Sequence, residues 1–291
     1  MVASGTAINL RNAPPSTGKD IAISYPTSRV LLVTMQRGYN MLNMEMQHTL
    51  SAIWKWYDTE PSLRCAVITG SGKSFCAGAN LKEWLATRLP SSSGAQASGP
   101  GYGGASWGEI SGGFGGMSRR VGKKPIVGAV NGLCLGGGME MAVNCDLVIA
   151  STRAEFGLPE VKRGVFAKMG ALGRVVRFIG LQRASELALL GDSISPQKAH
   201  EWGIVNLVVE HEQVVTKAVE WAEKIASNSP DSIIVSRMGM LMSLEHGSLE
   251  RGTQLVNDSP EVRGLENGDN IEEGLRSFKE KRPTKWIDSK L

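Results

Sequence analysis

Short hydrophobic runs rich in β-branched residues recur along the first two thirds of the chain, and they predict buried strands. The runs cover residues 30–34, 65–69, 126–130, 146–150 and 204–209. Between the first two runs, residues 44–57 carry apolar side chains at helical spacing, and Asn43 before them is a typical N-cap residue. Residues 138–144 are a second helix-sized stretch. Strands that alternate with helices indicate an α/β fold.

From about residue 212 onward, the strand pattern stops and apolar residues recur at helical spacing. One such face comprises Val215, Ala218, Trp221, Ala222 and Ile225. Residues 271–281 form a second helix candidate. An apolar helical region packs either on its own core or on another subunit. We therefore divide the chain into a core over residues 21–210 and a C-terminal helical oligomerisation region over residues 211–291.

Two segments do not fit this pattern of strands and helices. Residues 1–20 contain Pro14 and Pro15 and predict a flexible N-terminal arm. Residues 91–116 are rich in glycine and serine and predict a long mobile loop. Three aromatic residues interrupt this loop: Tyr102, Trp107 and Phe114. They either fold over a ligand or stand in solvent as part of a linker.

Composition and charge exclude several classes of protein. The 291 residues suffice for one large domain or for a core with an appendage, and 42% of them are hydrophobic. The net charge of +4 is scattered, so we expect no nucleic-acid partner, although a mild positive surplus suits an anionic small molecule. No apolar run approaches the ~18 residues of a membrane span, so we expect none. The four cysteines form no CxxC pair, which favours reduced thiols and a reducing compartment.

Three patterns look like known motifs but fail in their context. Residues 104–108 fit the GxSxG pattern of hydrolases, yet they lie in the glycine-rich loop without the strand and helix that this turn requires. Residues 70–74 look like the end of a phosphate-binding loop, but Val67 stands where its first glycine belongs. Residues 132–138 lack the GxGxxG spacing of a dinucleotide site. The three corresponding functions are therefore disfavoured.

Two glutamates near glycine residues are the strongest chemical signal in the chain. Glu140 follows the glycine run 136–138, and Glu160 closes the segment 156–160 (FGLPE). Their separation of 20 residues leaves room for a helix, a strand and a turn, so the two carboxylates can return to one site. Two carboxylates that face one water can deliver its oxygen and its proton to a double bond. This chemistry needs no metal and no cofactor.

Two junctions between a strand and a helix predict a place for a negatively charged oxygen. The segments 73–83 and 136–138 each follow a strand and lead into a helix, where backbone N–H groups are free to bind an anion. Two such groups aimed at one oxygen form an oxyanion hole. In the alternative interpretation, the glycines only permit close packing and Glu140 only caps a helix.

Together these segments resemble the crotonase (enoyl-CoA hydratase/isomerase) superfamily. The resemblance lies in residues 74–82 (SFCAGANLK), 129–140 (AVNGLCLGGGME), 144–146 (NCD) and 156–160 (FGLPE), and residues 278–283 are similar to the family's last helix. It implies an α/β fold in which a spiral of repeated ββα units precedes a helical trimerisation region, usually in a hexamer. It also implies an acyl-CoA substrate, with coenzyme A bound as part of that substrate and no separate cofactor.

Matched position by position, the resemblance implies roles for single residues. The amides of Ala77 and Gly137 would form the oxyanion hole. Glu140 and Glu160 would be the two glutamates of the hydratases. We assign Glu140 as the base that activates water and Glu160 as the donor of a proton to Cα, and the reverse assignment stays open. The other substrate or CoA contacts would be Cys76, Gly78, Ala79, Asn80, Leu81, Gly136, Lys168, Phe278 and Lys281, of which the last two would meet the CoA of a neighbouring subunit.

The presence of both glutamates favours the hydratase branch, and thus hydration of a 2-enoyl-CoA to a 3-hydroxyacyl-CoA. Two alternatives remain open. A double-bond isomerase of enoyl-CoA needs one well-placed base, and a non-catalytic acyl-CoA-binding subunit needs none.

The chain departs from the family pattern at two places. Asn80 stands where the family usually has aspartate, which affects local turn bonding more than chemistry. Residues 166–171 (FAKMGA) stand where hydratases often carry PGAGG, close to the acyl group and the water. Lys168 either reaches solvent or points into the pocket, where it would pair with Glu160 or meet a polar acyl chain. Phe166 and Met169, with Trp107 from the loop, would then supply an apolar wall.

The last three residues, Ser289, Lys290 and Leu291, match a peroxisomal targeting tripeptide. Such a signal requires an exposed tail, which the polar residues before Leu291 permit. We therefore expect delivery to the peroxisome through the import receptor, in a eukaryotic host.

Overall fold

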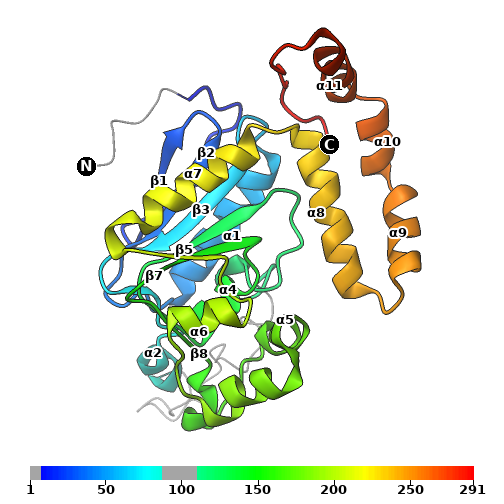
Figure 1. Ribbon diagram of the computed structural model, residues 1–291. Helices are drawn as coiled ribbons and strands as arrows, with labels where there is room; N and C mark the ends of the chain where they lie inside the picture. Colours follow the sequence, from blue (N-terminus) through cyan, green and yellow to red (C-terminus); the bar gives the residue numbers. More distant parts are fainter. Residues whose placement is uncertain (1–7, 87–109) are drawn as a thin grey trace, which may run out of the picture.

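The computed structural model describes residues 8–86 and 110–291, and its strands form two sheets (Figure 1). The strands are β1 (Ile21–Thr27), β2 (Val30–Met35), β3 (Cys65–Gly70), β4 (Ser74–Cys76), β5 (Ile126–Val130), β6 (Leu133–Leu135), β7 (Leu147–Ser151), β8 (Glu155–Gly157) and β9 (Leu207–Val209). The larger sheet has six strands in the order β1-β2-β3-β5-β7-β9, where β1 and β2 pair antiparallel and the other neighbours pair parallel. The smaller sheet has three parallel strands in the order β4-β6-β8.

The chain repeats one unit as it winds between the two sheets. The helices are α1 (Met44–Thr59), α2 (Leu81–Ala86), α4 (Gly137–Ala142), α5 (Ala171–Ser185), α6 (Pro196–Glu201), α7 (Val214–Ala226), α8 (Pro230–Glu245), α9 (Leu249–Asn257), α10 (Pro260–Glu266) and α11 (Asp269–Glu280), with the short turns η1 (Phe114–Gly116), η2 (Pro159–Arg163), η3 (Glu186–Leu190) and η4 (His211–Gln213). The order β3-β4-α2 is followed by β5-β6-α4 and then by β7-β8-η2, so each unit adds one strand to each sheet. This repeat confirms the predicted spiral of ββα units.

Helices cover both faces of the larger sheet (Figure 1). On one face, α7 packs its small residues Ala218, Ala222 and Ala226 on β-branched residues of β2, β3 and β5. On the other face, α1 buries its apolar stripe, and Asn43 caps this helix as predicted by accepting the Met46 N–H at 2.8 Å. Helix α7 therefore belongs to the core, although the sequence pattern assigned it to the C-terminal region.

Helices α8 to α11 form an arm beside the core (Figure 1). Three of these helices begin with a serine whose hydroxyl accepts a backbone N–H of the first turn: Ser229, Ser248 and Ser259. Helix α11 confirms the helix predicted over 271–281, and Lys281 ends it in a left-handed conformation with φ 53°. None of the helices within the described ranges is long and apolar enough to cross a membrane.

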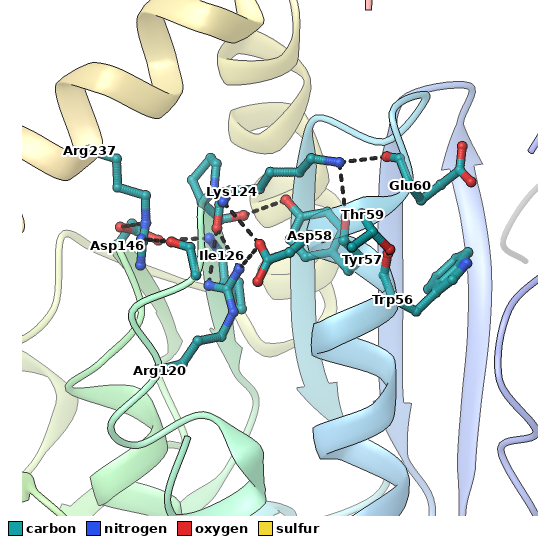
Figure 2. A network of polar contacts seen from close by, with 12 residues as sticks. Trp56, Tyr57, Asp58, Thr59, Glu60, Arg120, Lys124, Ile126, Asp146 and Arg237 are labelled. Atoms are coloured by element: carbon teal, nitrogen blue, oxygen red, sulfur yellow. Dashed lines mark hydrogen bonds and ion pairs between the residues drawn. The ribbon is translucent and has the colours of Figure 1, made fainter. Parts of the chain in front are cut away.

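A polar network joins the arm to the core (Figure 2). Arg237 on α8 is buried and pairs with Asp146 at 2.7 Å. The second carboxylate oxygen of Asp146 accepts the N–H of Ile126, at the start of β5, at 2.8 Å. Nearby, Arg120 pairs with Asp58 at the end of α1. Because each of these charges has a partner, its removal from water is compensated.

The residues after α11 run back over the arm and the core. The polar contacts that hold them include Ile287 N–H to Asn270 at 3.0 Å, the Ser289 hydroxyl to Asp231, Lys290 to Asp269 at 2.7 Å, and the buried Arg64 guanidinium to the Trp286 carbonyl at 3.1 Å. Ser289 and Leu291 are half-buried. The tail therefore differs from the exposed tail expected from its polar sequence, because α11, α8 and the residue before β3 supply its partners.

The prediction of a flexible N-terminal arm is wrong for residues 8–20, and residues 1–7 lie outside the described part of the chain. The Glu60 carboxylate accepts the N–H groups of Arg11 at 3.1 Å and Asn12 at 2.7 Å. These charge-assisted bonds fix the segment beside the end of α1. Burial acts to raise the pKa of Glu60, but the hydrogen bonds from Ser62, Arg11 and Asn12 outweigh it and lower this pKa below the ordinary value.

The predicted mobile loop is also wrong where the structure describes it. Residues 91–109, with Tyr102 and Trp107, lie outside the described part of the chain. By contrast, Ile110 and Phe114 are 4% and 1% exposed. Glycines at 112, 113, 115 and 116 have positive φ and let the backbone turn tightly enough to bury the Phe114 ring beneath α4.

Candidate active site

A cavity of about 650 Å³ opens between the glycine-rich junctions, α2 and the segment 159–169. It brings together residues that stand far apart in the sequence. The predicted residues in its lining are Ala77, Gly78, Ala79, Asn80, Leu81, Gly136, Gly137, Glu140, Glu160 and Lys168. The two carboxylates therefore reach one cavity, one from α4 and one from η2.

Two glycines allow the backbones of the junctions to approach each other. Gly78 (φ 92°) and Gly136 (φ 54°) adopt left-handed conformations that residues with a side chain rarely adopt. A Cβ atom on Gly78 would lie 3.1 Å from the Leu135 carbonyl and 3.4 Å from the Gly137 nitrogen. A Cβ atom on Gly136 would lie 3.3 Å from the Glu160 carboxylate. Close packing and chemistry therefore depend on the same glycines.

Glu140 is 3% exposed and sits on the first turn of α4. Its Oε2 atom accepts the Ala171 N–H at 3.2 Å. Burial raises the pKa of Glu140 to about 7, and the nearby charge of Glu160 adds to this effect. The N–H groups of Ala171 and Met169 act in the opposite direction. The environment thus allows this group to exchange a proton near neutral pH.

Glu160 comes from η2, behind Pro159. Burial raises its pKa above the ordinary value, as it does for Glu140. Its Oε2 atom is buried and has no hydrogen-bond partner among the described residues. A buried carboxylate oxygen without a partner is costly unless a water or a ligand completes the site. Glu160 therefore presents an acceptor to whatever occupies the cavity.

The structure places the free amide at Ala79 rather than at Ala77. The Ala77 N–H donates to the Tyr39 carbonyl at 3.1 Å and is not available to a ligand. After it, the left-handed Gly78 changes the direction of the backbone. Neither the Ala79 N–H nor the Gly137 N–H donates to a protein acceptor within residues 8–86 and 110–291. The prediction of Ala77 as an oxyanion donor is therefore wrong.

Two further predicted residues serve the structure around the cavity. Cys76 is fully buried outside the lining, and burial raises the pKa of its thiol to about 12, so the predicted substrate contact is absent. Asn80 holds the start of α2. Its side-chain amide donates to the Glu83 carboxylate at 2.7 Å, and its carbonyl accepts the Trp84 N–H at 3.0 Å. This agrees with a local turn-bonding role for Asn80.

The unusual segment 166–171 borders the cavity. Lys168 and Phe166 line it with exposed side chains, and Met169 lines it from a buried position. Phe278 and Lys281 are exposed at the end of α11 and do not line the cavity of this chain. Their role toward a neighbour's ligand stays a prediction.

Several lining residues were missed by sequence reasoning, among them Met41, Trp84 and Arg163. Arg163 follows Glu160 by three positions in η2, and this spacing of one helical turn was a usable signal. Met41 reaches the cavity because its neighbour Leu42 forms an isolated bridge with Ala79. No local sequence pattern predicts a bridge between Leu42 and Ala79, which stand far apart in the chain.

Comparisons with known proteins agree with this geometry. Residues 26–289 match the family described as enoyl-CoA hydratase/isomerase. A mevalonyl-coenzyme A hydratase of Beauveria bassiana is 48% identical over 281 residues, covering 96% of this chain and 98% of that protein. A mevalonyl-coenzyme A hydratase of Aspergillus fumigatus is 44% identical, covering 92% and 95%. The crystal structure of an enoyl-CoA hydratase from Bacillus anthracis superposes with a TM-score of 0.79 at 32% identity, covering 92% and 99%.

The match spans both sheets and the arm, and the solved structures share the fold over nearly their whole length. The protein belongs to the enoyl-CoA hydratase/isomerase family, the crotonase superfamily, in its hydratase branch.

Proposed function

We propose that this protein is a CoA-thioester hydratase that adds water across the Cα–Cβ double bond of an acyl-CoA, or removes it in reverse. One observation carries this proposal: Glu140 and Glu160 line one cavity whose glycine-rich wall holds two backbone amides, those of Ala79 and Gly137, that have no protein acceptor in the described part of the chain. An isomerase would use one base, whereas addition of water uses two groups that handle protons. The second buried carboxylate therefore favours hydration.

The two amides would act on the thioester carbonyl. Its oxygen would accept hydrogen bonds from the Ala79 N–H and the Gly137 N–H. These bonds polarise the conjugated double bond, make Cβ electrophilic and stabilise the enolate that forms when oxygen adds there. Loss of one such donor typically raises the barrier by roughly 3–4 kcal/mol.

The two glutamates would act on the water. Glu140 accepts a proton from the water as its oxygen bonds to Cβ, and Glu160 gives its proton to Cα, so that one water is added in total. The pair must hold one proton between its members for this step. Burial raises the pKa of both groups and so favours retention of that proton near neutral pH. Because the two groups interact, the two limbs of a bell-shaped pH–rate profile would belong to the pair.

The named relatives indicate an acyl group. Mevalonyl-CoA carries a hydroxyl and a methyl group on Cβ and a second hydroxyl at the end of its chain. Removal of water from it gives a branched 2-enoyl thioester. We propose this pair as substrate and product, supported by two mevalonyl-coenzyme A hydratases at 48% and 44% identity. Lys168 and Arg163 bring N–H donors to the cavity lining, where they suit a terminal hydroxyl.

The proposal is tested by incubating the purified protein with mevalonyl-CoA and with crotonyl-CoA and following the enoyl thioester by absorbance. Glu140→Gln and Glu160→Gln should each lower kcat by about 100-fold or more while CoA-ester binding is kept. Full activity in either variant would rule out the two-carboxylate mechanism. A 3-enoyl-CoA that yields only a shifted alkene would indicate an isomerase, and binding without turnover would indicate a non-catalytic subunit.

The substrate assignment has its own test at Lys168. Lys168→Met should lower kcat/KM for mevalonyl-CoA relative to crotonyl-CoA by about 10-fold, which corresponds to about 1.4 kcal/mol of discrimination. Lys82→Met is the matched control, because Lys82 is also an exposed lysine in the cavity lining. An unchanged ratio in Lys168→Met would show that Lys168 takes no part in substrate choice.

A further inference from the structure

Ser118 is fully buried outside the cavity, yet its hydroxyl bonds to two segments that shape the site. Its Oγ atom accepts the Phe114 N–H at 2.8 Å and donates to the Met169 carbonyl at 2.7 Å. A buried hydroxyl with both a donor and an acceptor in place is fixed in orientation. Ser118 therefore joins η1 to the segment that precedes α5.

The segment that precedes α5 contacts Glu140. Two residues after Met169, the Ala171 N–H donates to the Glu140 carboxylate at 3.2 Å. Between them, Gly170 has φ 120° and packs against the Ser118 carbonyl, because a Cβ atom on it would lie 3.2 Å from that oxygen. The position of the N–H groups that face Glu140 thus depends on how this short stretch is anchored to Ser118.

The turn η1 supports Gly137 through Phe114. A Cβ atom on Gly137 would lie 2.5 Å from the Phe114 ring, so the ring is packed directly against the residue whose amide faces the cavity. Phe114 is 1% exposed, and its backbone N–H is the group that Ser118 holds. Movement of Phe114 would therefore displace the start of α4.

We propose that Ser118 is a positioning residue for catalysis: its single hydroxyl fixes the backbone that holds Glu140 and the ring that supports the Gly137 amide. The proposal rests on the proposed hydratase function. It assigns Ser118 no contact with the substrate. Both effects act on the transition state, where the base and the oxyanion donor must be correctly placed at the same moment.

The expected effect on pH dependence has a definite sign. The N–H groups of Ala171 and Met169 favour the carboxylate form of Glu140, so loosening them raises its pKa. The charged groups that act on Glu140 are Glu160, which raises its pKa, and Arg119, which lowers it, with Arg174 also within electrostatic range. None of these three bonds to the Ser118 hydroxyl. Loss of that hydroxyl should therefore move the pH–rate profile to higher pH.

The test compares Ser118→Ala with wild type for kcat, KM and the full pH–rate profile. We expect kcat to fall by about 10-fold, KM to stay within about twofold, and the profile to move to higher pH. Ser51→Ala is the matched control. Ser51 is 8% exposed, and its hydroxyl donates to the Ser111 carbonyl at 3.2 Å, close to η1 but without any bond to Met169. This control should keep the wild-type profile.

Each outcome bears on the proposal. An unchanged kcat and profile in Ser118→Ala overturns it, and so does an equal loss of kcat in both variants without a shift of the profile, which would indicate a purely structural role. If Ser118→Ala does not fold, Ser118→Cys decides the question. Cysteine is close to serine in size and keeps a weak S–H donor, and the pH–rate profile of this variant must also move to higher pH. A shift that disappears in high salt would point to displaced Arg119 instead. Wild-type protein without hydratase activity would overturn the proposed function first.

Discussion

At the scale of single residues, Glu140 couples proton binding to stability. Its folded pKa of about 7 exceeds the ordinary value of 4.5, so the folded state binds the proton more tightly than the unfolded state does. The stability that this group contributes is complete below pH ~4.5 and is lost as pH rises through about 7.

Glu140→Gln should therefore be more stable than wild type at pH 8, by about 2–3 kcal/mol, and nearly equal to it at pH 5. The free energy of unfolding from urea titrations at both pH values measures this difference. Equal stability of the two proteins at pH 8 would contradict the burial argument.

The sequence predicts Glu140, Glu160 and Gly137 as site residues because each belongs to a dense local motif, and the structure places all three in one cavity lining. The sequence-based prediction of the second amide, that of Ala77, is wrong. Whether Ala77 or Ala79 offers a free N–H depends on the Tyr39 carbonyl, which comes from a different segment of the chain. Such a choice is a property of tertiary packing, and local spacing does not contain it.

At the scale of elements, the attachment of α8 depends on Arg237. This arginine and its partner Asp146 are largely buried, and removal of one member leaves the other without compensation. Arg237→Met should lower the free energy of unfolding by about 3–5 kcal/mol. Arg276→Met serves as the control, because Arg276 pairs with Glu272 on the exposed surface of α11 and should change stability by less than about 1 kcal/mol.

Urea titrations of both variants check this prediction. Arg237→Met combined with Asp146→Asn should recover part of the loss, because the uncompensated carboxylate is then gone. Equal stabilities of the Arg237 and Arg276 variants would show that the network in Figure 2 contributes little to holding the arm.

Elements with strong local periodicity were predicted well. The five apolar runs predicted strands β2, β3, β5, β7 and β9 of the larger sheet, and Asn43 marked the start of α1 correctly. Strands β1, β4, β6 and β8 were not predicted. The stretch 110–116 was mispredicted because its composition is that of a linker. Its burial comes from partners that no local rule supplies, such as Gln47, whose side-chain oxygen accepts the Gly115 N–H.

At the scale of the whole molecule, α11 presents an apolar stripe to solvent. Ile271, Leu275 and Phe278 follow helical spacing and are 37%, 68% and 87% exposed. A stripe of this kind is expected to be covered by another copy of the chain. We predict a trimer or a dimer of trimers, measured by light scattering. Phe278→Glu should lower the mass and raise KM for CoA esters.

Leu249→Glu is the matched control for this prediction, because Leu249 is 74% exposed but lies on α9. It should leave both the mass and KM close to the wild-type values. Wild-type protein that is monomeric and fully active would contradict the prediction.

The residues of the proposed peroxisomal signal also take part in folding, because they belong to the tail that packs on the arm and the core. Its tripeptide, Ser289 to Leu291, lies within the segment that returns over the arm, next to the contact between Trp286 and the buried Arg64. Deletion of residues 286–291 would remove the Trp286 carbonyl that the buried Arg64 guanidinium contacts. The deletion therefore tests folding as well as targeting. Replacement of Leu291 alone leaves these contacts in place, and a fluorescent fusion should then turn from punctate to diffuse. If a receptor reads the tripeptide, it must first release Ser289 from Asp231, and import and folding would then compete for the same residues.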